Sequence, residues 1–123
     1  MRLVIEAAIE LRREIVTRSR DKTRRRFDFC REEPVVWKPT EVVNPECGLC
    51  FTDIGAWHFI ADQVESGCDI YEVELRKPPQ TLGYELHLPG APGNPPIYIK
   101  FRLIQSEIRG RSFHNSTRPL PTI

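Results

Sequence analysis

The sequence has no run of about 18 apolar residues, the length that a membrane-spanning helix requires. Its first 30 residues also lack the apolar core of a secretory signal peptide, because Glu6, Glu10 and Glu14 interrupt them. We therefore expect a cytoplasmic protein with reduced thiols and no contact with a membrane. No internal repeat or low-complexity segment is present. Hydrophobic residues make up 40% of the 123 positions, which predicts one folded domain over residues 1–123 rather than a disordered chain.

The sequence also has almost no net charge, formally +1 at pH 7, which does not favour a protein that binds polyanions over its whole surface. The charges are nevertheless segregated along the chain. Residues 1–26 hold nine Lys or Arg and four Asp or Glu, residues 27–96 hold four and twelve, and residues 97–113 hold four and one. The first and third segments are therefore candidates for binding a negatively charged partner.

The N-terminal segment 3–26 contains no Gly or Pro and predicts a helix. Its apolar residues recur at helical spacing, at Val4, Ala8, Leu11 and Ile15. Its second half is polar and basic, ending in Arg24, Arg25 and Arg26, and could be a helical extension or a nucleic-acid arm. The apolar stripe, into which Arg12 falls, is also a candidate surface for a partner protein or a homodimer. Prolines interrupt residues 27–50, which predicts an irregular linker.

A second helix is predicted between Thr52, a favourable N-cap, and Gly67, a favourable C-terminal stop. After Gly67 the hydrophobic period changes from helical spacing to strict alternation. The alternating segments predict four strands, at residues 71–75, 82–88, 97–103 and 108–114. The fold prediction is α+β, with the two helices packed on one face of a four-stranded antiparallel sheet. Residues 1–26 supply the N-terminal helix or arm, residues 51–116 the second helix and the sheet, and residues 117–123 a tail.

The most informative segment is the last hairpin, residues 97–116, in which a turn centred on Gln105 and Ser106 pairs Leu103 with Ile108. Continued without irregularity, this register places four cations and two aromatic rings on one face: Tyr98, Lys100, Arg102, Arg109, Arg111 and Phe113. Like charges directly opposite each other destabilise a sheet. The predicted register has two such pairs, Arg102 with Arg109 and Lys100 with Arg111, which is typical of a site that binds an anion. An RNA phosphate backbone is the natural candidate for that anion. A solvated strand face that happens to be basic is the alternative.

His114 ends the last predicted strand, beside this basic face. Imidazole exchanges protons near neutral pH, so the combination favours phosphodiester cleavage without a metal. In that reaction a base takes the 2′-hydroxyl proton, an acid protonates the leaving 5′-oxygen, and cations stabilise the phosphorane. A strand-end histidine that makes an ordinary hydrogen bond is the alternative interpretation.

Tyr98-Ile99-Lys100 followed by Ser112-Phe113-His114 resembles the end of bacterial type II toxin–antitoxin mRNA interferases of the motility quorum-sensing regulator type. The resemblance implies a barnase/RelE-like fold, RNA cleavage without a metal or cofactor, and a tight antitoxin partner. It places Tyr98 and His114 at active-site positions. The spacing between them is one residue longer than in that pattern, so we expect a β-bulge at Gly110 that brings the two side chains together.

These arguments together predict a metal-independent endoribonuclease toxin. Its catalytic residues would be Tyr98, Lys100, Arg111 and His114, and its RNA-binding residues Arg102, Arg109 and Phe113. The alternative function is a non-catalytic module that binds RNA or an acidic protein with the same face of the hairpin.

The four cysteines give only a weak zinc signal. Cys47 and Cys50 have the spacing of a zinc knuckle, but a second C-x-x-C is missing and Cys30 and Cys68 stand alone. We therefore favour reduced thiols and expect no metal. Of the other histidines, His58 is four residues before Asp62, as in a surface helix pair, and His87 lies on the polar face of its predicted strand, where it could extend the active face.

Overall fold

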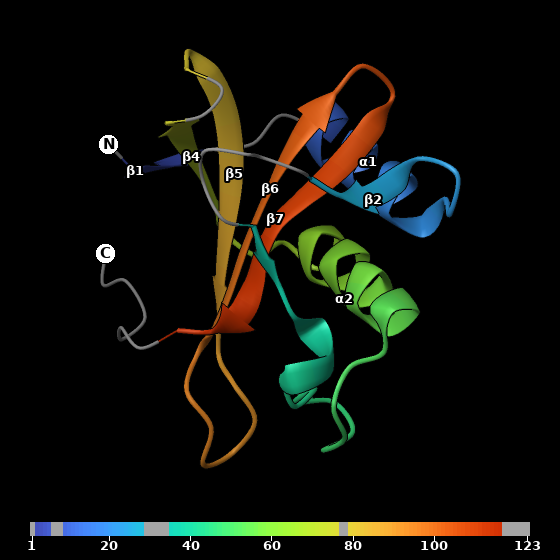
Figure 1. Ribbon diagram of the computed structural model, residues 1–123, viewed down its shortest axis with the longest axis vertical. Helices are drawn as coiled ribbons and strands as arrows, with labels where there is room; N and C mark the ends of the chain where they lie inside the picture. Colours follow the sequence, from blue (N-terminus) through green and yellow to red (C-terminus); the bar gives the residue numbers. More distant parts are fainter. Residues whose placement is uncertain (1, 6–8, 29–34, 77–78, 117–123) are drawn as a thin grey trace.

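The computed structural model of the protein describes residues 2–5, 9–28, 35–76 and 79–116 (Figure 1). Over these residues the fold is α+β, with two helices, α1 (Ile9–Arg20) and α2 (Asp53–Glu65), on the same side of a mixed β-sheet. No helix in these ranges is long and apolar enough to cross a membrane.

Four consecutive antiparallel strands form the centre of the sheet, as the alternating pattern predicts. They are β4 (Ile70–Leu75), β5 (Thr81–Leu88), β6 (Ile97–Ile104) and β7 (Glu107–Asn115). Each lies within two residues of its predicted bounds. The period-2 alternation locates these strands well because one face of the sheet is buried against the helices and the other is more polar.

Three short strands that the sequence analysis does not predict complete the sheet. β1 (Arg2–Ile5) pairs antiparallel with β4 at one edge. At the other edge, β2 (Arg25–Phe27) and β3 (Val36–Trp37) both pair in parallel with β7, at successive positions along it. The expectation of a four-stranded, purely antiparallel sheet is therefore wrong at both edges.

The N-terminal helix is shorter than the predicted 3–26, because both ends of that segment join the sheet. Strand pairing with β4 and β7 outweighs the helical pattern in these short stretches. Asp21 ends α1: its carboxylate accepts hydrogen bonds from the backbone N–H of Thr23, at 2.9 Å, and from the Thr23 hydroxyl, at 2.6 Å. The predicted linker 27–50 likewise contains β3, a 3-10 helix at Pro39–Glu41 and a bridge between Val43 and Cys50.

Helix α2 has the two end signals that the sequence predicts. The Thr52 side chain accepts a hydrogen bond from the Gly55 N–H at 2.9 Å, which satisfies one free donor of the first turn. Gly67 adopts a positive φ of 95°, and the chain leaves the helix there. The capped helix presents a buried face to the sheet, made by Ala56, Trp57, Phe59, Ile60, Ala61 and Val64.

The hydrophobic core lies between this helix face and the inner face of β5–β7. Ile97, Ile99 and Phe101 of β6 are fully buried there, with Ile15 of α1. The opposite face of the sheet, which we call the outer face, receives the alternate residues of the same strands. The outer face therefore carries the polar residues that the sequence analysis proposes as functional.

The β6–β7 hairpin contains the predicted bulge. Leu103 pairs with Ile108 and Phe101 with Gly110, but Lys100 pairs with Ser112, so Arg111 is the extra residue. Beyond this shift, Tyr98 lies opposite His114. Without it, the register of the turn would place Phe113 opposite Tyr98.

Gly110 is packed directly against the Trp37 ring of β3. A Cβ atom at position 110 would lie 2.6 Å from Cη2 of Trp37 and closer still to two other atoms of the ring. The Trp37 ring in turn contacts Trp57 of α2 and Phe113 of β7, with centroid distances of 4.8 and 5.4 Å. The bulge therefore forms where only glycine allows an aromatic ring to contact the strand backbone.

Gly110→Ala is expected to destabilise the protein by about 1–3 kcal/mol, because the added methyl overlaps a ring that is itself packed on both sides. Urea unfolding measures the change. The matched test is the double variant Gly110→Ala/Trp37→Leu, which removes the ring that the methyl meets. The double variant should lose less stability than the sum of the losses in Gly110→Ala and Trp37→Leu. A loss equal to that sum would show that Trp37 does not exclude a side chain at position 110.

Candidate active site

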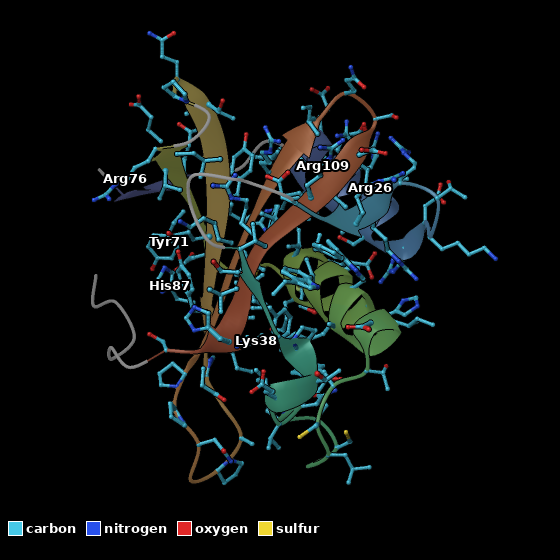
Figure 2. The ribbon with its side chains drawn as sticks, in the orientation of Figure 1. Arg26, Lys38, Tyr71, Arg76, His87 and Arg109 are labelled. Atoms are coloured by element: carbon cyan, nitrogen blue, oxygen red, sulfur yellow. The ribbon has the colours of Figure 1, made fainter. Side chains whose placement is uncertain are left out.

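Four ring-bearing side chains form a row across the outer face of the central strands. Tyr71 of β4, His87 of β5, Tyr98 of β6 and His114 of β7 follow one another, with ring centroids 4.9, 5.3 and 5.3 Å apart. Figure 2 shows Tyr71 and His87 on the side of β5 away from α2. The bulge is what brings the last member, His114, into this row beside Tyr98.

Glu85 of β5 holds two members of the row. Its side chain is only 2% exposed, and the Tyr98 hydroxyl donates to Oε2 at 2.5 Å while Nε2 of His87 lies 3.0 Å from Oε1. A buried carboxylate requires such partners because water cannot solvate it. The contacts fix the orientation of both rings, which leaves Nδ1 of His87 as the nitrogen that faces other groups.

His114 is held by a different contact that fixes its tautomer. Its Nδ1 lies 2.9 Å from the carbonyl oxygen of Asn115, and a carbonyl can only accept a hydrogen bond. Nδ1 therefore carries a hydrogen, and Nε2 is the nitrogen that can take up or release a proton. This half-buried imidazole is available for acid–base chemistry at the edge of the row.

Lys100 supplies a cation next to the row. It is half-buried on β6, two residues from Tyr98, between its cross-strand partners Glu85 on β5 and Ser112 on β7. Two residues along a strand correspond to about 6.6 Å, so Lys100 and Tyr98 are neighbouring positions on the outer face. Three of the four residues that the sequence analysis proposes as catalytic, Tyr98, Lys100 and His114, are thus brought together.

The predicted arginines form a separate cluster around Asp28, the residue after β2. Arg102 binds the Asp28 carboxylate through Nε at 2.8 Å and Nη2 at 3.1 Å, and Nη1 of Arg111 lies 2.9 Å from Oδ2. Nη1 of Arg109 is 3.7 Å from Oδ1. We call Arg102, Arg109 and Arg111 the arginine pocket. Since Arg102 and Arg111 are buried in it, they do not present open cations to RNA as the sequence analysis expects.

Phe113 is also not the RNA-stacking residue that the sequence analysis expects. The bulge reverses its orientation relative to the unbroken register, so that it points into the core, where it is fully buried against Phe51 and Trp37. His114 takes the outer-face position instead.

The basic N-terminal arm is likewise engaged within the protein. Arg12 donates to the carbonyl oxygens of Val64 and Cys68, both at 2.9 Å, at the C-terminal end of α2. Arg20 binds Asp62 and Glu65 of α2, Arg24 donates to the Ser106 carbonyl, and Arg26 pairs with Glu107. These contacts hold α1 and β2 against α2 and the β6–β7 turn, so the segment is packed on the fold; its binding to nucleic acid stays a prediction.

Three residues of the site are missed or undervalued by the sequence analysis. Glu85 and His87 alternate with apolar residues and therefore look like ordinary solvated positions. The available signal is that both fall on the same strand face as Tyr98 once β5 is paired with β6. Asp28 had no such signal, because its contact with Arg102 joins residues 74 apart in the sequence.

The cysteines do not form a metal site in the described part of the chain, where no group of three or more His, Cys, Asp or Glu side chains could hold a metal ion. Cys47 and Cys50 are exposed on one loop, whereas burial raises the pKa of the Cys68 thiol to about 11. Cys30 lies outside the described residues.

Comparisons of the chain with protein families, with curated proteins and with solved structures give no match.

Asp28→Asn should lower the free energy of unfolding by about 3 kcal/mol at pH 7, because it removes the negative charge that the buried guanidinium groups of Arg102 and Arg111 bind. Burial raises the pKa of Asp28, but the hydrogen bonds and charges of Arg102 and Arg111 together lower it by more. The pKa of Asp28 therefore lies below its ordinary value. A carboxylate whose pKa is lowered by folding stabilises the fold above about pH 4. This stabilisation is lost as the pH falls through the folded-state pKa.

The difference between wild type and Asp28→Asn, measured by urea unfolding, should therefore be large at pH 7 and shrink below about pH 4. Asp53→Asn, at an exposed position of α2, provides the matched control for loss of a carboxylate. A difference for Asp28→Asn that is the same at both pH values would contradict an ionised, arginine-bound Asp28.

Proposed function

We propose that the protein is a metal-independent endoribonuclease of the toxin type, which cleaves RNA by attack of a 2′-hydroxyl on the adjacent phosphorus. The observation that supports this most directly is the pairing of Tyr98 with His114 across the bulge, with Lys100 beside them. This arrangement combines a proton-exchanging imidazole, an oriented hydroxyl and a cation within one small area.

The reaction needs two proton transfers, and the site offers two imidazoles for them. Nε2 of His114 accepts the 2′-hydroxyl proton while the 2′-oxygen forms its bond to phosphorus. The bond from phosphorus to the 5′-oxygen breaks, and that oxygen takes a proton from Nδ1 of His87. The Glu85 carboxylate accepts the Nε2 hydrogen of His87, so Nδ1 is the nitrogen that faces the leaving oxygen. The products are a 2′,3′-cyclic phosphate and a 5′-hydroxyl.

Tyr98 and Lys100 act on the phosphate between these groups. The Tyr98 ring lies between the two imidazoles, and its hydroxyl is fixed by Glu85, so it orients the reacting linkage. The Lys100 ammonium offsets the negative charge that develops on the phosphorane oxygens. Arg111, to which the sequence analysis assigns that role, is instead buried in the arginine pocket and bound to Asp28.

A toxin of this type requires a protein that inhibits it, and we propose an antitoxin as the partner that covers the outer face. The homodimer suggested for the N-terminal helix has less support, because Arg12 and Ile15 of its stripe are used within the chain.

Wild type is expected to cleave single-stranded RNA in the presence of EDTA, and His114→Ala to lower the rate roughly 100- to 10,000-fold, the usual contribution of a general acid or base. Cleavage of a labelled RNA on a denaturing gel measures the rate, and thermal unfolding confirms that the variant is folded. His58→Ala, on the exposed side of α2, is the matched control and should cleave as wild type does.

RNA that is bound but left intact by wild type would favour the alternative, a binding module. An His114→Ala variant that cleaves at the wild-type rate would contradict the assignment of the imidazole.

A further inference from the structure

The arginine pocket binds its carboxylate in the geometry with which arginines bind phosphate. Arg102 approaches both oxygens of Asp28 through two nitrogens of one guanidinium plane, and Arg111 adds a third hydrogen bond at 2.9 Å. Such fork-shaped contacts suit planar carboxylates and tetrahedral phosphates alike, because both present two oxygens at similar separation. The donor set is therefore not specific for an aspartate.

The pocket also lies in line with the proposed catalytic residues. Tyr98, Lys100 and Arg102 alternate along the outer face of β6, so the pocket is one outward position beyond Lys100, at a spacing of about 6.6 Å. On β7, Arg111 directly precedes Ser112, the partner of Lys100. A polyanion that passes over Tyr98 and Lys100 along these strands would bring a second phosphate to the pocket.

The anion in the pocket comes from a different part of the chain than the cations do. Asp28 follows the three-residue edge strand β2, and its N–H donates to the Gly110 carbonyl at 2.7 Å. Asp28, Arg102 and Arg111 are each less than one tenth exposed. A phosphate bound between Arg102 and Arg111 would therefore take the place of the Asp28 carboxylate.

We infer that the arginine pocket is a phosphate-binding site that Asp28 fills as an internal stand-in, so that RNA competes with this side chain. The RNA part of this inference rests on the proposed function, whereas the phosphate part stands independently of it. Asp28 then lowers the affinity for RNA and keeps the pocket closed in the free protein. A purely structural ion cluster, the opposing account, predicts no affinity for phosphate when the carboxylate is removed.

The test uses Asp28→Ala, which removes the carboxylate and leaves space for another anion. Inorganic phosphate at millimolar concentration should raise the thermal midpoint of this variant by several degrees more than that of wild type, since a ligand that binds the native state stabilises it. Isothermal titration with phosphate should show one site in the variant. A 2′-deoxy oligonucleotide, which cannot be cleaved, should bind the variant about tenfold more tightly, as the loss of one charge-assisted competitor implies.

Two controls separate the pocket from general effects of charge. Adding Arg111→Met to Asp28→Ala should abolish the phosphate effect, and Asp62→Ala, which removes an exposed partner of Arg20, should not create one. If Asp28→Ala does not fold in phosphate-free buffer, recovery of folding by phosphate supports the inference and failure to recover overturns it. Equal responses of wild type and Asp28→Ala to phosphate also overturn it. If Asp28→Ala binds phosphate but wild type does not cleave RNA, the phosphate site is supported and only the proposed nuclease activity is refuted.

Discussion

The contact between the Gly110 backbone and the Trp37 ring lies at the irregularity of the last hairpin that determines where Phe113 and His114 point. This contact coincides with the bulge at Arg111. The bulge changes the pairing of all residues beyond it, which are residues 97–100 of β6 and 112–115 of β7. One extra residue moves Phe113 from the outer face into the core and moves His114 from the core side to a position beside Tyr98. The candidate active site is therefore a consequence of core packing on the opposite side of the sheet.

The charged side chains are also arranged by contacts between distant parts of the chain. The sequence places its positive charges at the two ends and its negative charges between them, and the fold brings these parts together. Arginines of α1 bind the end of α2, Arg26 of β2 pairs with Glu107 at the start of β7, and Asp28 enters the arginine pocket. What distinguishes the outer face is therefore the combination of Lys100 with two oriented imidazoles, rather than a large excess of positive charge.

The sequence was sufficient for the elements whose signals are local. Alternation located β4–β7, and Thr52 and Gly67 marked the ends of α2. The bulge at Gly110 was expected from the resemblance, because the spacing between Tyr98 and His114 is one residue longer than in the pattern of that family. The sequence was insufficient where distant pairing decides the structure. β1 and β2 are short segments that become strands only because β4 and β7 offer free edges. Glu85 and Asp28 acquire their roles through partners on other strands, which no spacing along the chain reveals.

The candidate active site depends most directly on the register of β6 against β7 beyond the bulge. Cross-strand nuclear Overhauser contacts between backbone protons in solution measure that register without reference to activity. We expect contacts that place Tyr98 opposite His114 and Lys100 opposite Ser112. Contacts that place Tyr98 opposite Phe113 would mean that the hairpin continues without a bulge, and both the ring row and the proposed chemistry would then be wrong.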